Sequence, residues 1–551
     1  MHPQPPQLRT SDSATAHGVT RFGLTPTRRL LACAMLASLA TASSGAIAAG
    51  ATGEAGAPQT GGVLKVAFDG DPRCIDPQQV GNNTALNVGR QLTDSLTDQR
   101  PENGEVVPWL AERWTVSPDS REFSFFLRDG VTFSDGTPVD ANAVKANFET
   151  IIKMGARATL GSTYLAGLKS ITTPDARTIT ITFEQPNAQF LQATSTMSLG
   201  LFAQTTLDAT AEARCQGALV GSGPFVFDTF VSNQRVTLKH REGYAWPSSL
   251  AKHQTRAYLD GIEFRIIPES GVRNGSLISR QIDVNTSVQP QDEKVLEAQK
   301  LPILARSNPG LVYSLFPNFK AAVPGDIAVR RAVNKGIDRP ELQAIISRYQ
   351  KPATSVLALT TPLYVDQTAA LAYDPDGARK LLDEAGWKET ADGVREKDGQ
   401  KLVLVLQYWQ STPFLELIQQ QLRAIGVDLQ LNKATISQVT ALRDTGKLDI
   451  QFYNLTRADP DILRTVFISD GRNVNFRERS EVDDLLAKSA GTLDTAVRQD
   501  LIARAANLLV TDGNAIPLVE LATVTATGKN VFGLHYEASS RLQFYDTWLK
   551  R

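Results

Sequence analysis

The segment 122–148, EFSFFLRDGVTFSDGTPVDANAVKANF, constrains the fold more strongly than any other part of the chain. Its first apolar side chains stand at every second position, which is the period of a strand with one buried face. These side chains belong to Phe123, Phe125 and Leu127. The dipeptide Asp129-Gly130 then predicts a turn, and residues 131–133 predict a short second strand.

A helix is expected directly after this turn and strand. Residues 135–138 interrupt the strand pattern, and Asp140 stands where a helix cap is needed. The apolar residues that follow have helical spacing and predict an inner face of Val144, Phe148, Ile151 and Ile152. The segment contains no His and no Cys, so it predicts a scaffold and not a reactive site.

The residues of this segment, and those just before it, resemble a pattern of the extracytoplasmic solute-binding proteins of the oligopeptide/dipeptide/nickel class, family 5, which supply ABC importers. The matching residues are Pro108, 110–112, Trp114, 127–131, Phe133, 135–138, Ala143 and Val144. Further segments that match the family are 221–225, 330–342, 373–387 and 420–429. The resemblance extends over roughly residues 61–545, and its motifs are specific to this family.

The first 48 residues read as a targeting segment. Arg28-Arg29 precede an apolar run at 30–40, and Ala46-Ile47-Ala48 fits a cleavage site for a signal peptide. The twin arginines favour the twin-arginine route, while ordinary Sec export stays open. A lipoprotein box at 30–33 is the less favoured interpretation. Residues 49–60 predict a flexible leader, and no later run has the length of a membrane span. We therefore expect a soluble, exported, periplasmic protein.

Length and charge exclude several classes of protein. A chain of 551 residues is too long for one core, so two or three domains are expected. The formal net charge is −1, and no basic patch indicates nucleic-acid binding. The histidines after the targeting segment are scattered, so we expect neither a metal site nor a cofactor; they are His240, His253 and His535. The S-x-x-K match at 249–252 lacks a partner motif and is interpreted as coincidence.

Strand and helix patterns give the fold class. Residues 177–183 alternate strictly and predict a strand, and residues 87–96 predict a helix. After about residue 308 helices and strands alternate, which is typical of an α/β unit. The segments concerned are a helix over 338–349 with Leu342, Ile345, Ile346 and Tyr349 inward, a helix over 374–386, a strand over 402–406 and a helix over 412–426.

The resemblance implies the architecture: an α/β, two-lobe periplasmic binding protein fold (class II-like, cluster C) with a subdomain inserted in a discontinuous first lobe. The expected boundaries are 61–90, 210–307 and 516–551 for the first lobe, 91–209 for the subdomain and 308–515 for the second lobe. Two crossing strands would form the hinge. Cys74 and Cys215 each flank a motif, and in relatives these two motifs lie in the same lobe. Because an exported protein meets an oxidising compartment, we expect a Cys74–Cys215 disulfide; two buried free thiols are the alternative.

The resemblance also places ligand contacts in the second lobe, after the strand that ends at 406 and before an Asp-Pro-Asp motif. The residues expected there are Tyr408, Trp409, Tyr453, Asn454, Arg457 and Asp459. Tyr408 or Trp409 could instead be core. Asp459 could merely cap a helix, and Arg457 could form a surface ion pair with Asp459 or Asp461.

One departure from the peptide-binding relatives bears on the ligand. They clamp a peptide amine with an acidic residue in this loop, where this chain has Thr456, Arg457 and Ala458. Arg457 would repel an ammonium group and favour an anion. Either Asp459 or Asp69 holds the amine, or the solute is a carboxylated molecule such as an opine.

The sequence thus predicts a monomeric substrate-binding component of an ABC importer, not an enzyme. It would capture a peptide or similar small solute by hinge closure and deliver it to a membrane permease and ATPase complex. Two alternatives come from other functional classes. One is an exported enzyme on a binding-protein fold, and the other is a chaperone-like exported protein.

Overall fold

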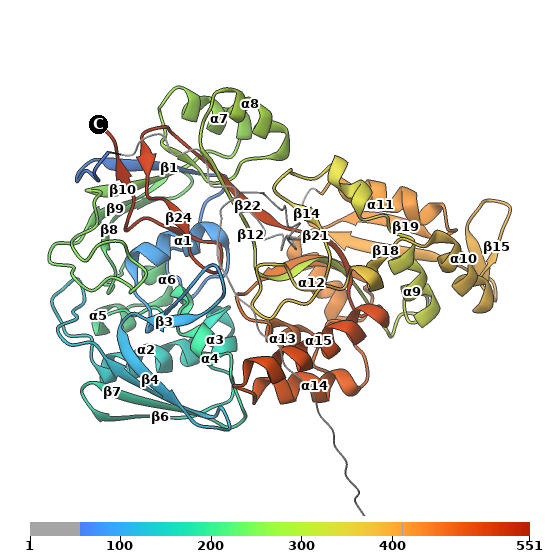
Figure 1. The fold of residues 1–551 in the computed structure, drawn as a ribbon, viewed down its shortest axis with the longest axis horizontal. Helices are drawn as coiled ribbons and strands as arrows, with labels where there is room; N and C mark the ends of the chain where they lie inside the picture. The colour runs from blue at the N-terminus through green and yellow to red at the C-terminus, as the bar shows by residue number, and fades with distance from the viewer. Residues whose placement is uncertain (1–55, 410–411) are drawn as a thin grey trace, which may run out of the picture. The chain divides into compact units, whose positions relative to one another are not determined.

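Two large sheets, each with its own core, organise the computed structural model, which describes residues 56–409 and 412–551 (Figure 1). Ala49–Arg551 form one unit. The first large sheet has seven strands, in the order β12 (Ile303–Ser307), β22 (Ala522–Thr527), β11 (Val284–Asn285), β1 (Val63–Phe68), β10 (Gly261–Ile266), β9 (Arg235–His240) and β8 (Phe225–Val231). The second has six strands, in the order β14 (Lys351–Pro352), β21 (Ile516–Glu520), β13 (Gly310–Pro317), β20 (Ile450–Thr456), β18 (Val403–Tyr408) and β19 (Asp428–Lys433).

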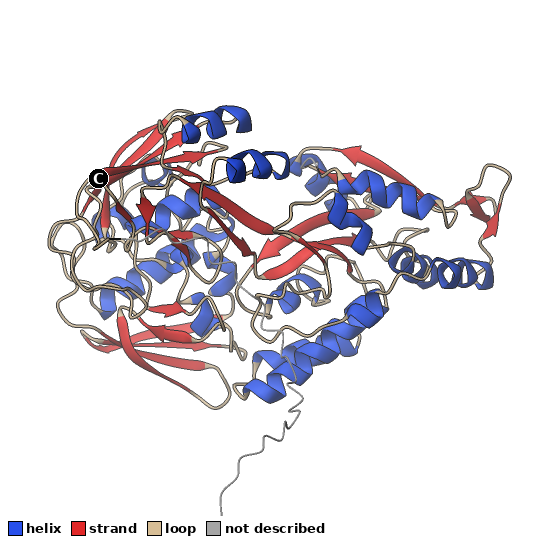
Figure 2. Cartoon of the chain, turned by 45° about the horizontal axis from the view of Figure 1, so that its top comes forward, coloured by secondary structure: helices blue, strands red, loops and turns tan. Residues whose placement is uncertain are grey.

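A smaller antiparallel sheet, visible among the red strands of Figure 2, is built on the segment that the sequence singled out. Its strands are β4 (Ala111–Val116), β5 (Glu122–Leu127), β7 (Thr178–Phe183) and β6 (Leu168–Asp175). The alternating side chains predicted for β5 and β7 are buried. The ring of Phe190 meets the rings of Phe123 and Phe183 edge to face, with centroids 5.1 and 4.8 Å away, which is a favourable aromatic geometry.

The helix after this sheet agrees with the prediction except at one position. It is α2 (Ala141–Met154), and the Asp140 carboxylate accepts a hydrogen bond from the Ala143 amide at 2.8 Å. Val144, Phe148 and Ile151 are buried, but Ile152 is 41% exposed, because it turns away from the sheet. The predicted strand over 131–133 is wrong: only an isolated bridge between Thr132 and Pro138 forms, although its apolar side chains are buried.

The helices around the seven-stranded and four-stranded sheets are mostly short. They are α1 (Asn83–Leu92), α3 (Gly161–Tyr164), α4 (Phe190–Ala193), α5 (Gln204–Leu207), α6 (Ala211–Cys215), α7 (Ser270–Ile278) and α8 (Glu293–Ala298). We call these sheets, α2 and these helices the first lobe, together with the segments that connect them, which include β2 (Thr97–Gln99). The helix predicted over 87–96 begins earlier, because Asn82 accepts a hydrogen bond from the Ala85 amide and starts α1 at Asn83.

Longer helices cover both faces of the six-stranded sheet (Figure 1). One core lies between the sheet and α9 (Ile327–Lys335), α10 (Pro375–Glu384) and α11 (Phe414–Arg423). The other lies under α13 (Ile462–Phe467), α14 (Glu481–Ala490) and α15 (Thr495–Thr511). Together with α12 (Ile436–Asp444), these elements form what we call the second lobe. The helices predicted over 374–386 and 412–426, and the strand over 402–406, are confirmed within a few residues.

The helix predicted over 338–349 is wrong. Only a 3₁₀ turn forms, Pro340–Ala344, and Ile345 is 40% exposed. The reason is tertiary: the Arg339 guanidinium is bound by backbone carbonyls of its own lobe, and Ser347 turns away to hydrogen-bond Glu293 of α8. These contacts outweigh the apolar spacing that favoured a longer helix.

The two lobes are joined by short connections. β12 ends at Ser307 and β13 begins at Gly310, while β21 ends at Glu520 and β22 begins at Ala522. The first connection passes from the seven-stranded to the six-stranded sheet, and the second passes back. β21, which the sequence reading placed in the first lobe, pairs with β13 and β14 of the second.

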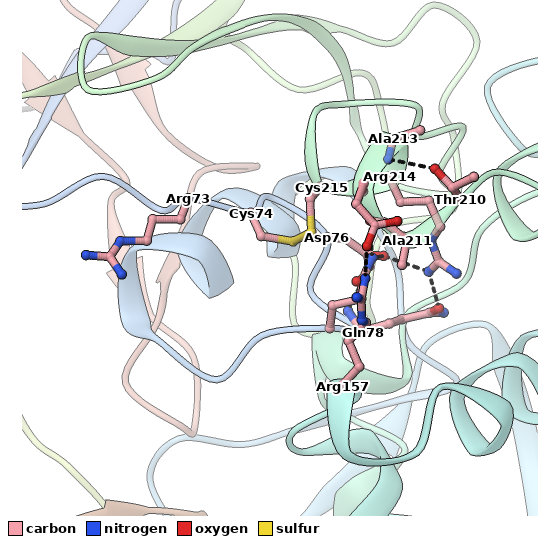
Figure 3. Close-up of a disulfide and its surroundings, with 12 residues drawn as sticks. Arg73, Cys74, Asp76, Gln78, Arg157, Thr210, Ala211, Ala213, Arg214 and Cys215 are labelled. Atoms are coloured by element: carbon pink, nitrogen blue, oxygen red, sulfur yellow. Dashed lines mark hydrogen bonds and ion pairs between the residues drawn. A yellow bond between two sulfur atoms is a disulfide. The ribbon is translucent and has the colours of Figure 1, made fainter. Parts of the chain in front are cut away.

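The predicted disulfide is confirmed (Figure 3). Cys74 and Cys215 join the chain after β1 to the end of α6, across a sequence separation of 141. Beside the disulfide, the Arg214 guanidinium forms a buried ion pair with Asp76 at 2.8 Å and donates to Gln78 at 2.6 Å. The disulfide and the ion pair therefore connect the same two segments of the first lobe.

In the described part of the chain, no helix has the length and apolar character needed to cross a membrane. The targeting segment, the lipoprotein box and most of the predicted leader lie outside the described residues.

Candidate functional site

The expected ligand residues follow two strands that lie side by side. β18 and β20 are parallel neighbours, with Leu406 opposite Ile450 and Gln407 opposite Gln451. Their carboxyl ends therefore meet at one edge of the second sheet. In α/β sheets ligands bind outside the carboxyl ends of strands, so the residues after β18 and β20 form the candidate site. We call residues 457–461 the β20 loop.

Arg457 of this loop is buried against the first lobe. The residue is only 5% exposed. One guanidinium nitrogen donates to Gln189 at 3.2 Å and to Thr465 at 2.7 Å, and the other to Thr163 at 3.5 Å. The guanidinium also lies over the Tyr164 ring, 4.9 Å from its centroid, in a cation–π contact. The predicted alternative, an ion pair of Arg457 with Asp459 or Asp461, is wrong.

Both carboxylates of the loop are paired with other arginines. Asp459 accepts two hydrogen bonds from Arg498 of α15, at 2.7 and 3.2 Å. Asp461 accepts two from Arg464, at 2.7 and 2.8 Å. Such bidentate pairs orient both partners. Asp459 also accepts a hydrogen bond from the Asp461 amide, so it fixes the loop and is occupied by protein groups.

The loop contacts the first lobe through its backbone as well. The side-chain amide of Gln99, on β2 (Thr97–Gln99), donates to the Ala458 carbonyl at 3.0 Å. The residue before Gln189 makes a second contact between the lobes. The backbone amide of Ala188 donates to the Ala490 carbonyl of α14 at 2.7 Å. The Gln99 side-chain oxygen is buried and has no hydrogen-bond partner among the described residues. The site therefore combines residues of both lobes.

The aromatic residues expected at the site do not form one surface. Tyr408 packs against the core under α9, α10 and α11, while Trp409 packs against the core on the other face. Trp409 is stacked on Tyr453, with ring centroids 6.3 Å apart. Tyr453 is 5% exposed and its ring also contacts Phe316; burial raises the pKa of its hydroxyl. Asn454 lies on β20 and is partly exposed.

Several residues of this site were not anticipated from the sequence. They are Gln99, Thr163, Tyr164, Gln189, Thr465 and Arg498. These residues come from distant segments and belong to no motif, so no local sequence signal points to them. Within residues 56–409 and 412–551, no three His, Cys, Asp or Glu side chains are grouped closely enough to hold a metal ion. The site offers one cation, Arg457, whose hydrogen-bond partners are neutral groups, beside carboxylates that are paired with other arginines. Such a site suits recognition of a polar solute.

Comparison with known proteins gives a family match. A model of the bacterial extracellular solute-binding proteins, family 5 (middle region), matches residues 105–471. The glutathione-binding protein of Shigella flexneri is 27% identical over 504 residues, which cover 88% of this chain and 94% of that protein. Its counterpart from Escherichia coli K12 is 26% identical over a stretch of the same length.

Solved structures share the fold. A binding protein of Brucella suis, NikA, solved with Fe(III)-EDTA, superposes with a TM-score of 0.76 at 22% identity, covering 89% of this chain and all of that one. The oligopeptide-binding protein AppA of Bacillus subtilis, solved with a nonapeptide, gives a TM-score of 0.73 at 21% identity, covering 90% and 100%. The predicted α/β two-lobe fold is therefore confirmed.

Proposed function

This chain belongs to the bacterial extracellular solute-binding proteins of family 5, and from that premise we propose that it captures a peptide or similar small solute in the periplasm and delivers it to the permease and ATPase complex of an ABC importer. Capture occurs when the lobes close on the solute, and the solute leaves chemically unchanged. Binding and release need no catalytic residue or cofactor, so the protein acts as a monomeric receptor and not as an enzyme.

The observation that supports this most directly is the division of the chain into two lobes with separate cores. Within residues 56–409 and 412–551, the chain passes between the large sheets at 308–309 and at 521. A few residues at such connections can absorb the change in backbone angles that hinge closure requires. Residues of both lobes, including Gln99 and Arg457, meet at the carboxyl ends of β18 and β20. A solute held there would be enclosed by both lobes.

The relatives named for glutathione binding make glutathione a natural probe, since it is a tripeptide with two carboxylates. A second candidate keeps the receptor role but takes a carboxylated solute that is not a peptide, such as an opine. Arg457 favours this candidate, because it stands where the peptide-binding relatives have an acid and is buried without an ion-pair partner among the described carboxylates.

Calorimetric titration with glutathione, trialanine and octopine tests the proposal. We expect saturable one-to-one binding of at least one probe, and a smaller radius of gyration by small-angle X-ray scattering when it binds. The probe should be recovered intact by mass spectrometry after long incubation, since an enzyme would convert it. Absence of binding by all three, or conversion of the bound probe, contradicts the proposed function.

A further inference from the structure

A contrast between two buried arginines of the second lobe, Arg339 and Arg457, points to the role of Arg457. Arg339 is a structural example. Its guanidinium donates to the Pro517, Asn334, Ile337 and Leu371 carbonyls and to the Asn334 side chain, all within the second lobe. Burial lowers the pKa of Arg339 to about 9. Backbone acceptors inside one lobe cannot be exchanged without unfolding that lobe.

Arg457 has partners of another kind. The oxygens that accept its hydrogen bonds belong to the side chains of Thr465, Gln189 and Thr163. Two of these three partners lie in the first lobe, so they separate from Arg457 when the lobes separate. Side-chain acceptors can rotate, and the bond to Thr163, at 3.5 Å, is long for a hydrogen bond. The guanidinium can therefore exchange these partners for a ligand group.

The charge around Arg457 is unbalanced. Asp459 is taken by Arg498 and Asp461 by Arg464, which leaves the Arg457 cation as the excess charge of the β20 loop. The first-lobe residues that contact the loop through hydrogen bonds or the cation–π contact are Gln99, Thr163, Tyr164 and Gln189, and none of them is an Asp or a Glu. A charge buried without an anionic partner is costly. A solute carboxylate at this position would supply the missing partner, whereas an ammonium group would be repelled.

We propose that Arg457 binds a carboxylate of the captured solute, so that the β20 loop selects for an acidic group on the solute and against a free amine. This inference rests on the proposed receptor function and names the chemical class of group that the receptor requires. A guanidinium fork binds a carboxylate through two parallel hydrogen bonds. The uncharged Gln99 and Gln189 amides beside it are suited to the peptide-like groups next to that carboxylate.

Calorimetry with three forms of one peptide tests the inference. Trialanine has both ends free, trialanine amide lacks the carboxylate and N-acetyl-trialanine lacks the amine. We expect trialanine amide to bind at least about 30-fold more weakly than trialanine, since a buried charge pair of this kind is worth about 2 kcal/mol or more. N-acetyl-trialanine should bind at least as tightly as trialanine, because it keeps the carboxylate and lacks the amine.

Variants assign the effect to Arg457. In Arg457→Gln the two carboxylate peptides should lose at least about 30-fold in affinity and become similar to the amide. Arg457→Lys should recover only part of the difference, because lysine lacks the fork. Arg479→Gln removes an equal charge from an exposed ion pair with Asp484 and should bind like the wild type. Circular dichroism establishes that each variant is folded.

The possible failures are distinguishable. If the amide binds the wild type as tightly as trialanine, the receptor function stands and the assignment of a carboxylate to Arg457 is overturned. Discrimination that persists in Arg457→Gln overturns the assignment in the same way. If the wild type binds none of the three peptides, nor glutathione or octopine, the receptor proposal itself fails and this inference falls with it. The wild-type comparison decides the question even if Arg457→Gln does not fold.

Discussion

At the scale of single residues, buried ion pairs fix the surroundings of the candidate site. The clearest is Asp483 with Arg477, at 2.6 Å and almost fully buried. Burial by itself would raise the pKa of Asp483, but hydrogen bonds from Arg477 and from the Ser469 and Ser480 amides outweigh it and hold this pKa well below its usual range. Asp483 thereby joins α14 to the segment that follows α13.

Asp483→Asn should destabilise the protein by about 3 kcal/mol, because it leaves the Arg477 cation buried without its partner. Since folding lowers the pKa of Asp483, its ionisation stabilises the fold fully above the unfolded value of about 4, and this contribution is lost as the pH falls below that value. Urea unfolding at pH 7 and pH 3 measures both effects. Asp484→Asn, at an exposed ion pair, should cost less than about 1 kcal/mol; equal losses in the two variants would contradict the assignment.

The residue types of the site could be predicted, but their partners could not. The resemblance pointed to Arg457 and Asp459 from the loop before the Asp-Pro-Asp motif. Nothing local indicates that Asp459 pairs with Arg498 or that Arg457 meets Gln189, 268 positions away in the sequence. Such pairs are decided by how the lobes meet, which is a tertiary property.

At the scale of secondary structure, the sequence was reliable where a cap and a periodic pattern agreed. Asp140 with α2 and Asp374 with α10 are examples, since each carboxylate caps the helix that its apolar spacing predicts. It failed over 338–349, where Asp338 accepts a hydrogen bond from the Glu341 amide but the 3₁₀ turn ends at Ala344. There the contacts of Arg339 and Ser347 with other segments decide the conformation.

The cap at Asp140 gives a prediction for α2. Asp140→Ala should destabilise the first lobe by about 1 kcal/mol, because the Ala143 amide loses its acceptor. Asp140→Asn keeps an acceptor oxygen and should stay within a few tenths of a kcal/mol of the wild type. Urea unfolding followed by circular dichroism measures both variants. An alanine variant as stable as the asparagine variant would show that the sheet alone holds α2 in place.

At the scale of the whole molecule, the two lobes have separate cores and touch each other through polar contacts that lie outside both cores. The Ala188 backbone amide of the first lobe donates to the Ala490 carbonyl of the second at 2.7 Å, and the Gln99 side-chain amide donates to the Ala458 carbonyl. α8 adds a further contact, since Glu297 pairs with Arg348 at 2.6 Å. Separation of the lobes, as the proposed hinge motion requires, would break these contacts, so they would report on closure without touching the solute.

The Ala188 amide therefore serves as a probe of closure. When the lobes are apart it has no acceptor and should exchange rapidly with solvent, and when they meet its bond to Ala490 should protect it. Hydrogen–deuterium exchange with mass spectrometry should thus show slower exchange around residue 188 on saturation with a bound peptide, by tenfold or more. The Phe183 amide, bonded to Arg121 within the small sheet, is a control whose exchange should not change. Equal protection at Ala188 with and without a tightly bound solute would mean that the lobes do not separate, and would exclude hinge closure as the means of capture.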